Sequence, residues 1–138
     1  LRDHRHAFFA AQGAAEGEAE RHAPLWRLSV PAATGPIELP GTQLVEWGGA
    51  LRWYRPSAEA IAALSGTVPA APQTAAQALR ERIAALGGTA TLFRADEAHA
   101  DVLRFHPLAP VNLQIHQRLK QAFDPRGLIN HGRMYPGL

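Results

Sequence analysis

The chain has 138 residues, enough for one domain with its own core, and 46% of them are hydrophobic, which excludes a disordered polymer. It has no cysteine, which excludes disulfides and thiolate chemistry, and no apolar run approaches the roughly 20 residues of a membrane span. The formal charge is +2 with a pI of about 9.7. Its basic residues are dispersed arginines and one lysine, a pattern that argues against nucleic-acid binding, which needs a basic patch.

Residues 1–23 are predicted to be a flexible segment that leads into the domain. A short helix anchored by Phe8 and Phe9 is expected first, and the small and acidic residues after it are typical of a loop. The segment also holds three histidines, His4, His6 and His22. A zinc site needs at least three protein ligands at a suitable spacing, and these three histidines do not have such a spacing. We therefore expect exposed histidines and assign no metal site.

Alternating apolar and polar residues predict a strand at 25–30, with Trp26, Leu28 and Val30 on one face. Further strands are expected at 42–47 and 50–54, joined by a two-residue hairpin turn at Gly48–Gly49. A glycine pair also lets a backbone approach a ligand closely, and the two roles are compatible.

A short helix is predicted after Ser57, followed by a loop rich in proline and alanine. Helical spacing then predicts a helix at 74–86, capped by Thr74 and closed by Gly87–Gly88, with an inward stripe at 75, 79, 83 and 86. A strand is expected at 89–93 and a short edge strand at 102–105. The last helix is predicted at 111–123, with one buried stripe at 111, 115, 119 and 122–123, and Asp124-Pro125 ends it.

This order predicts an α+β fold, a largely antiparallel sheet with helices packed on one face, as a single domain over 1–138. No catalytic residue is assigned, because no serine has a nucleophile-elbow context and the carboxylate pairs lie in polar loops. A Gly-rich strand-to-helix fingerprint is also missing, so the chain is not expected to bind a dinucleotide by itself.

The run FDPRGLINHGR at 123–133 resembles the C-terminal signature of FAD-linked oxidases of the vanillyl-alcohol-oxidase type, whose tail returns to the flavin domain. His131 stands where that family usually has proline. Four further blocks resemble the FAD-binding subunit of bacterial glycolate oxidases: Leu25–Pro31, Glu46–Trp53, Gly87–Arg94 and Phe105–Leu108. Together they span most of residues 25–138.

The resemblance implies a ferredoxin-like cap domain, the C-terminal fragment of a longer flavoprotein whose FAD-binding domain lies upstream. It implies oxidation of glycolate, or another small 2-hydroxy acid, in a complex with a second FAD subunit and an iron–sulfur subunit. Substrate oxidation is expected in that second subunit, so this fragment would shield FAD, dock partners and be inactive alone. The expected location is cytoplasmic, with peripheral attachment to the inner membrane through the complex left open.

Five residues are candidate FAD contacts under this resemblance: Arg94, Asn130, Arg133, Trp47 and His106. An arginine at 133 can neutralise the flavin pyrophosphate or the anionic N1 region of reduced flavin. Each candidate has a structural alternative: an ion pair between domains for Arg94, a core position for Trp47 and a structural histidine for His106.

Two other functions stay open from the sequence. One is a non-catalytic α+β protein-interaction module whose flavin pocket has decayed. The other is the cap of a different oxidase, acting on another 2-hydroxy acid or an alcohol.

Overall fold

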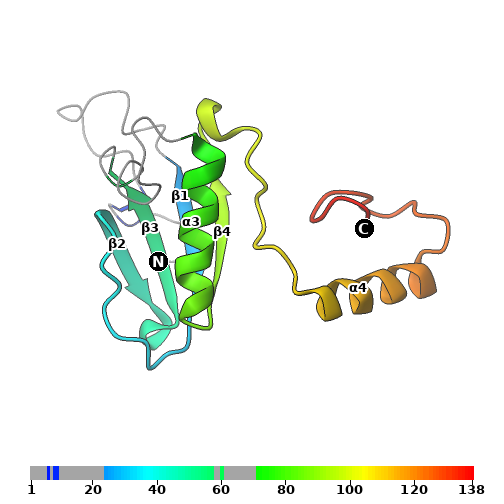
Figure 1. Ribbon diagram of the computed structural model, residues 1–138, viewed down its shortest axis with the longest axis horizontal. Helices are drawn as coiled ribbons and strands as arrows, with labels where there is room; N and C mark the ends of the chain where they lie inside the picture. The colour runs from blue at the N-terminus through cyan, green and yellow to red at the C-terminus, as the bar shows by residue number, and fades with distance from the viewer. Residues whose placement is uncertain (1–5, 7, 10–23, 58–59, 61–70) are drawn as a thin grey trace. The chain divides into compact units, whose positions relative to one another are not determined.

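The computed structural model describes residues 6, 8–9, 24–57, 60 and 71–138 (Figure 1). The segment predicted as flexible at 1–23 and the helix predicted after Ser57 lie largely outside these residues. The chain divides into two compact units, Leu1–Leu103 and Arg104–Leu138.

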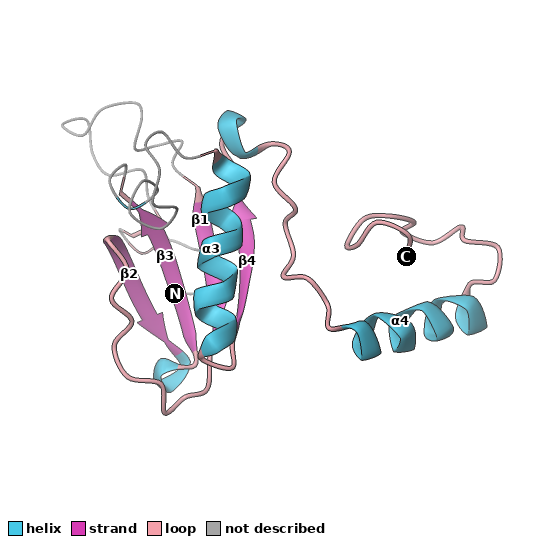
Figure 2. Ribbon diagram, in the orientation of Figure 1, coloured by secondary structure: helices cyan, strands magenta, loops and turns pink. Residues whose placement is uncertain are grey.

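The first unit is built on a four-stranded sheet in the order β2-β3-β1-β4, and every neighbouring pair is antiparallel. The strands are β1 (Leu25–Ser29), β2 (Gly41–Glu46), β3 (Leu51–Pro56) and β4 (Thr89–Arg94). Helix α3 (Pro72–Ala85) lies along one face of this sheet (Figures 1 and 2). The α+β class with a largely antiparallel sheet is confirmed.

The main core lies between the sheet and α3. The predicted alternation in β1 holds, since Trp26 and Leu28 enter this core together with Val30. From α3 come Leu79 and Ile83, which are 2% and 0% exposed. Burying such a side chain contributes about 1.5–3 kcal/mol, so this stripe fixes the helix on the sheet.

The two ends of α3 follow different rules. The prediction that Thr74 caps the helix was wrong: Pro72 occupies the first turn and Ala71 is the N-cap without a side-chain bond. Proline presets the helical φ, so the helix starts two residues early. At the other end Gly87 N–H donates to the Ala84 carbonyl and Gly88 N–H to that of Ile83, at 2.8 and 3.0 Å. This Schellman arrangement was predicted by the glycine pair.

The second sheet face carries a smaller apolar cluster. Phe9, Leu25, Leu51 and Trp53 are buried there. The Trp53 ring meets Phe9 and Phe93 edge to face, with centroids 5.1 and 4.9 Å apart.

Two local predictions in this unit were wrong. The turn between β2 and β3 is not a two-residue hairpin, because the 3-10 turn Trp47–Gly49 and then Ala50 join the strands. Residues 102–105 form bends instead of a strand. Val102 is drawn into the core and the Leu103 carbonyl accepts a hydrogen bond from Nη2 of Arg80, which leaves no extended edge to pair.

The second unit consists of α4 (Pro110–Phe123) and the tail that follows it (Figure 2). The predicted apolar stripe is present, but no residue of α4 is buried. Its exposed members are Val111, Ile115, Leu119 and Phe123. Within the second unit the predicted stripe is therefore not buried, because the tail does not cover it.

None of the described helices is long and apolar enough to cross a membrane.

Candidate functional site

Trp47 and Arg94 lie at opposite corners of the first unit. Trp47 follows β2, one edge strand, at the end where Glu46 pairs with Leu51. Arg94 ends β4, the other edge strand, at the end where it pairs with Leu25. Since β1 runs from Leu25 to Ser29 and Ser29 also pairs with Leu51, these are different ends of the sheet. The structure does not bring these two candidates together.

Trp47 is presented outward from the sheet. Its side chain is 82% exposed and its φ is 52°, in the left-handed region that side-chain-bearing residues seldom adopt. A core role, which the sequence left open for this tryptophan, is therefore excluded within the first unit. Trp53, by contrast, is buried, and its Nε1 donates to the Glu46 carboxylate.

Arg94 has an exposed side chain at the end of β4, next to a register shift between Leu25 and Trp26. In the described part of the chain no ion pair involves it. Its guanidinium can therefore take an anion or a carboxylate from outside this unit.

Asn130 and Arg133 do lie together, in a turn of the tail. The Arg133 N–H donates to the Asn130 carbonyl at 3.2 Å, and its Nη1 to the Asn130 Oδ1 at 3.4 Å. Asn130 has a φ of 50° and Gly132 of 68°, both left-handed. Asparagine and glycine tolerate that region, and His131 lies between them, where the signature that this tail resembles usually has proline. Both Asn130 and Arg133 are exposed.

His106 belongs to the same unit as this turn. Its carbonyl accepts a hydrogen bond from the Tyr135 hydroxyl at 3.1 Å, and the Phe105 and Tyr135 rings are 5.8 Å apart. The tail is thereby tied back to the segment before α4. Sequence reasoning missed Tyr135, and only its place in an otherwise irregular tail could have signalled it.

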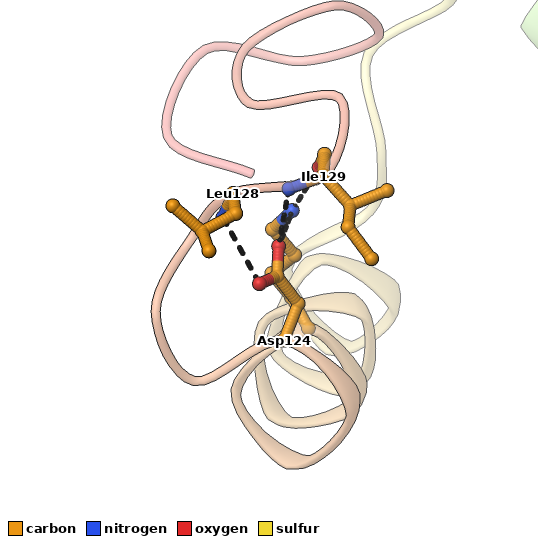
Figure 3. A network of polar contacts seen from close by, with 4 residues as sticks. Asp124, Leu128 and Ile129 are labelled. Atoms are coloured by element: carbon orange, nitrogen blue, oxygen red, sulfur yellow. Dashed lines mark hydrogen bonds and ion pairs between the residues drawn. The ribbon is translucent and has the colours of Figure 1, made fainter.

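Asp124 was predicted only to end the helix, yet it organises the tail (Figure 3). Its carboxylate accepts hydrogen bonds from Lys120 Nζ at 2.7 Å and from the N–H groups of Leu128 and Ile129 at 2.9 and 2.8 Å. The Lys120 ammonium also donates to the Ile129 carbonyl. These bonds, that of Lys120 first, lower the pKa of Asp124 to about 2. The Lys-x-x-x-Asp spacing on a helix is the sequence signal that could have indicated the contact between Lys120 and Asp124.

The second sheet face adds an arginine that the sequence did not single out. Arg27 is exposed on β1, an interior strand, with Trp53 and Thr91 as its cross-strand neighbours. Exposed Ser29 lies on the same face because strand residues alternate. The face thus offers a guanidinium and hydroxyl groups beside an aromatic cluster.

Asp96 and His99 form a partly buried pair whose contacts have a structural explanation. The Asp96 carboxylate accepts from the His99 N–H at 2.8 Å and contacts its Nδ1, capping a short 3-10 turn. His99 lines a small cavity with Trp26 and Tyr54. Burial raises the pKa of Tyr54 to about 12, and its hydroxyl donates to the Pro40 carbonyl at 2.8 Å.

The hydrogen-bond donors of the candidate residues fit the pyrophosphate group of FAD. Arg94 and Arg133 offer exposed planar guanidinium groups, which match phosphate oxygens, and Asn130 adds an amide. Among the described residues, no group of three histidine, cysteine, aspartate or glutamate side chains is arranged to hold a metal ion. His4 and His22 lie outside those residues.

None of the protein-family models matches the chain, and no solved structure matches it. A curated relative, Glycolate oxidase subunit GlcE of Escherichia coli (strain K12), is 35% identical over 138 residues. The match covers 100% of this chain and 31% of the relative, so the chain spans about a third of the relative's length. The resemblance seen in its sequence blocks is confirmed: the chain is similar over its whole length to the C-terminal part of a glycolate oxidase subunit.

Proposed function

We propose that this chain is the C-terminal cap of an FAD-dependent oxidoreductase subunit that takes part in the oxidation of glycolate to glyoxylate. The observation that carries this proposal is the 35% identity with Glycolate oxidase subunit GlcE across all 138 residues. Because the chain spans only part of that relative, the activity, the substrate and the partners all belong to the proposal.

The cap role uses the second sheet face. Helix α3 covers the first face, so we assign the second face to the cofactor domain; part of that face is covered within the chain, since Phe9 and Trp53 are buried there. On that face Phe93 is 43% exposed and Arg27 is also exposed. An aromatic and cationic face suits a planar cofactor that becomes anionic on reduction.

The tail contributes the other part of the cap. The Asp124 carboxylate holds the backbone of Leu128 and Ile129, whose side chains are 70% and 61% exposed. We place these side chains and the apolar stripe of α4 against the flavin-binding part of the same subunit, since exposed apolar surface of this extent marks an interface.

The flavin contacts we propose are the predicted ones, and Arg133 and Arg94 have the chemistry to neutralise the pyrophosphate or the reduced ring. Bound FAD would supply electron-transfer chemistry within the complex, and these residues would hold and shield it. Trp47 and His106 remain predicted contacts. The partners are a second FAD subunit and an iron–sulfur subunit, in the cytoplasm or peripherally on the inner membrane, and the isolated cap is inactive.

Flavin content of the full-length parent subunit tests the cofactor claim. We expect the purified subunit to carry FAD, and Arg133→Ala to lower its flavin occupancy by about tenfold or more, as loss of a charge-assisted contact would. Arg118→Ala, an exposed arginine of α4, is the control and should keep the flavin. A subunit that binds no FAD even when FAD is supplied would contradict the proposal and favour the non-catalytic interaction module.

A further inference from the structure

Asp124 is the only acidic side chain between Arg104 and Leu138, a stretch that also holds four arginines and one lysine. The Lys120 ammonium lies 2.7 Å from the Asp124 carboxylate and neutralises it. All four guanidinium groups are exposed: Arg104, Arg118, Arg126 and Arg133. The exposed charge of the second unit is therefore positive, which favours an anionic ligand.

The Asp124–Lys120 pair binds both backbone polar groups of one tail residue, Ile129 (Figure 3). The Ile129 N–H donates to the Asp124 carboxylate at 2.8 Å, and the Ile129 carbonyl accepts from the Lys120 ammonium. The N–H of Leu128 donates to the other carboxylate oxygen at 2.9 Å. The Ile129 carbonyl belongs to the same planar peptide unit as the N–H of Asn130, so the pair fixes the direction in which the chain enters Asn130.

Asn130 begins the turn that carries Arg133. Its φ of 50° is left-handed, its carbonyl accepts from the Arg133 N–H at 3.2 Å, and its Oδ1 accepts from Arg133 Nη1 at 3.4 Å. Further along the tail, the Tyr135 hydroxyl donates to the His106 carbonyl at 3.1 Å. The turn is therefore held on both sides, and the Arg133 guanidinium takes its direction from Asn130.

These contacts form a continuous path from a carboxylate to an exposed guanidinium. Asn130 and Arg133 are both exposed, so burial does not order them. An arginine binds phosphate best when two N–H groups of its planar fork face the oxygens. A tail without a fixed path would lose entropy to reach that arrangement, and the path from Asp124 reduces the loss.

We propose that Asp124 is a positioning residue for FAD: through Ile129 and Asn130 it orients the Arg133 guanidinium toward the pyrophosphate of the cofactor. The choice of FAD as the anion rests on the function proposed above. The control of the turn by Asp124 rests only on contacts within the second unit.

The charge of Asp124 and its position predict opposite effects on the binding of an anion. Removal of the carboxylate leaves the Lys120 charge without its partner, and the added positive charge by itself would strengthen the binding. Loss of the contacts to the tail would instead leave Arg133 with its charge but without its direction, and the binding would weaken. The sign of the change therefore separates positioning from simple electrostatics.

The test is a titration of the full-length parent subunit, stripped of flavin, with FAD, followed by flavin fluorescence. We expect Asp124→Ala to raise the Kd for FAD by about tenfold, and Asp124→Asn, which keeps one acceptor oxygen, to raise it less. Adding Asp124→Ala to Arg133→Ala should change the Kd by less than about threefold, because Asp124 acts through Arg133. Glu97→Ala removes an exposed carboxylate of the first unit and is the charge-matched control, with a Kd within about twofold of the parent's.

Tighter or unchanged binding of FAD by Asp124→Ala would overturn the proposal, and so would effects of Asp124→Ala and Arg133→Ala that add in free energy. Hydrogen exchange of the flavin-free subunit gives a second readout. The Arg133 amide should exchange faster in Asp124→Ala and at the parent rate in Glu97→Ala, and an unchanged rate in Asp124→Ala would also overturn the positioning. A parent subunit that binds no FAD contradicts the proposed function and FAD as the ligand, and exchange at the Arg133 amide then decides separately whether Asp124 holds the turn.

Discussion

The Asp124 carboxylate lies 2.7 Å from the Lys120 ammonium, four residues earlier on α4, and the same carboxylate accepts the backbone N–H groups of Leu128 and Ile129. One side chain thus ends the helix, neutralises a lysine and sets the path of the tail.

Replacing Asp124 with alanine should release the tail. We expect faster hydrogen exchange at the Leu128 and Ile129 amides, which lose their acceptor, with the exchange of α3 amides unchanged. Glu97→Ala, an exposed carboxylate of the first unit, is the control. Unchanged exchange at both tail amides would show that the tail is held by other contacts.

The same clamp should respond to acid in a defined direction. The pKa of Asp124 is lowered from 3.8 to about 2, so its stabilising effect is fully present above about pH 4 and is lost as the pH falls through about 2. An NMR titration of the Asp124 carboxyl and the Leu128 amide should report this midpoint. A titration at the ordinary aspartate pKa would mean that the clamp is absent in solution.

Arg80 is a buried arginine that holds the segment around Leu103 on the first unit. It is 4% exposed, its guanidinium lies 5.4 Å from the Trp26 ring, and Nη2 binds the Leu103 carbonyl. Burial lowers its pKa, and the described residues give it no carboxylate partner. Arg80→Ala should lower the free energy of unfolding by about 1–3 kcal/mol, because it removes packing and leaves a carbonyl unpaired. In denaturant titrations, exposed Arg82→Ala should differ from the parent by at most about 1 kcal/mol.

Gly88 and Gly35 offer a matched pair of glycine substitutions. A Cβ at Gly88 would lie 2.5 Å from the Ser29 carbonyl oxygen and 2.7 Å from a Val30 methyl, whereas at Gly35 it would meet nothing within 4 Å. Gly88→Ala should therefore destabilise the first unit by about 1–3 kcal/mol and Gly35→Ala by less than about 0.5 kcal/mol. Equal thermal unfolding of the two variants would refute the close packing of the turn after α3 against the end of β1.

Much of the fold was predictable because its signals are local. The alternation of apolar and polar residues predicted the bounds of the four strands to within two residues. Helical spacing together with Gly87–Gly88 predicted the end of α3. The errors arose where a distant group decides the local structure. Arg80 captures the Leu103 carbonyl at the expected strand 102–105, and Arg52 braces a turn that looked like a plain hairpin.

The candidate site was less predictable, for a physical reason. The sequence blocks identified residue types, and two of the candidates, Asn130 and Arg133, do lie in one turn because they are close in the sequence. The blocks carry no information on which corner of a sheet a residue occupies, so Trp47 and Arg94 were grouped although they lie at different ends. Asp124 was read as a helix stop because its three acceptor contacts form only once the tail folds back.

The measurement that tests the central claim most directly is the visible absorption spectrum of the full-length parent subunit, purified with its partners, before and after anaerobic addition of glycolate. We predict a flavin spectrum that bleaches as the substrate is oxidised, with no bleaching by acetate, which lacks the hydroxyl group. A flavin spectrum that glycolate leaves unchanged would contradict oxidation of this substrate and point to another hydroxy acid or alcohol. A preparation without flavin would contradict the FAD-dependent cap itself.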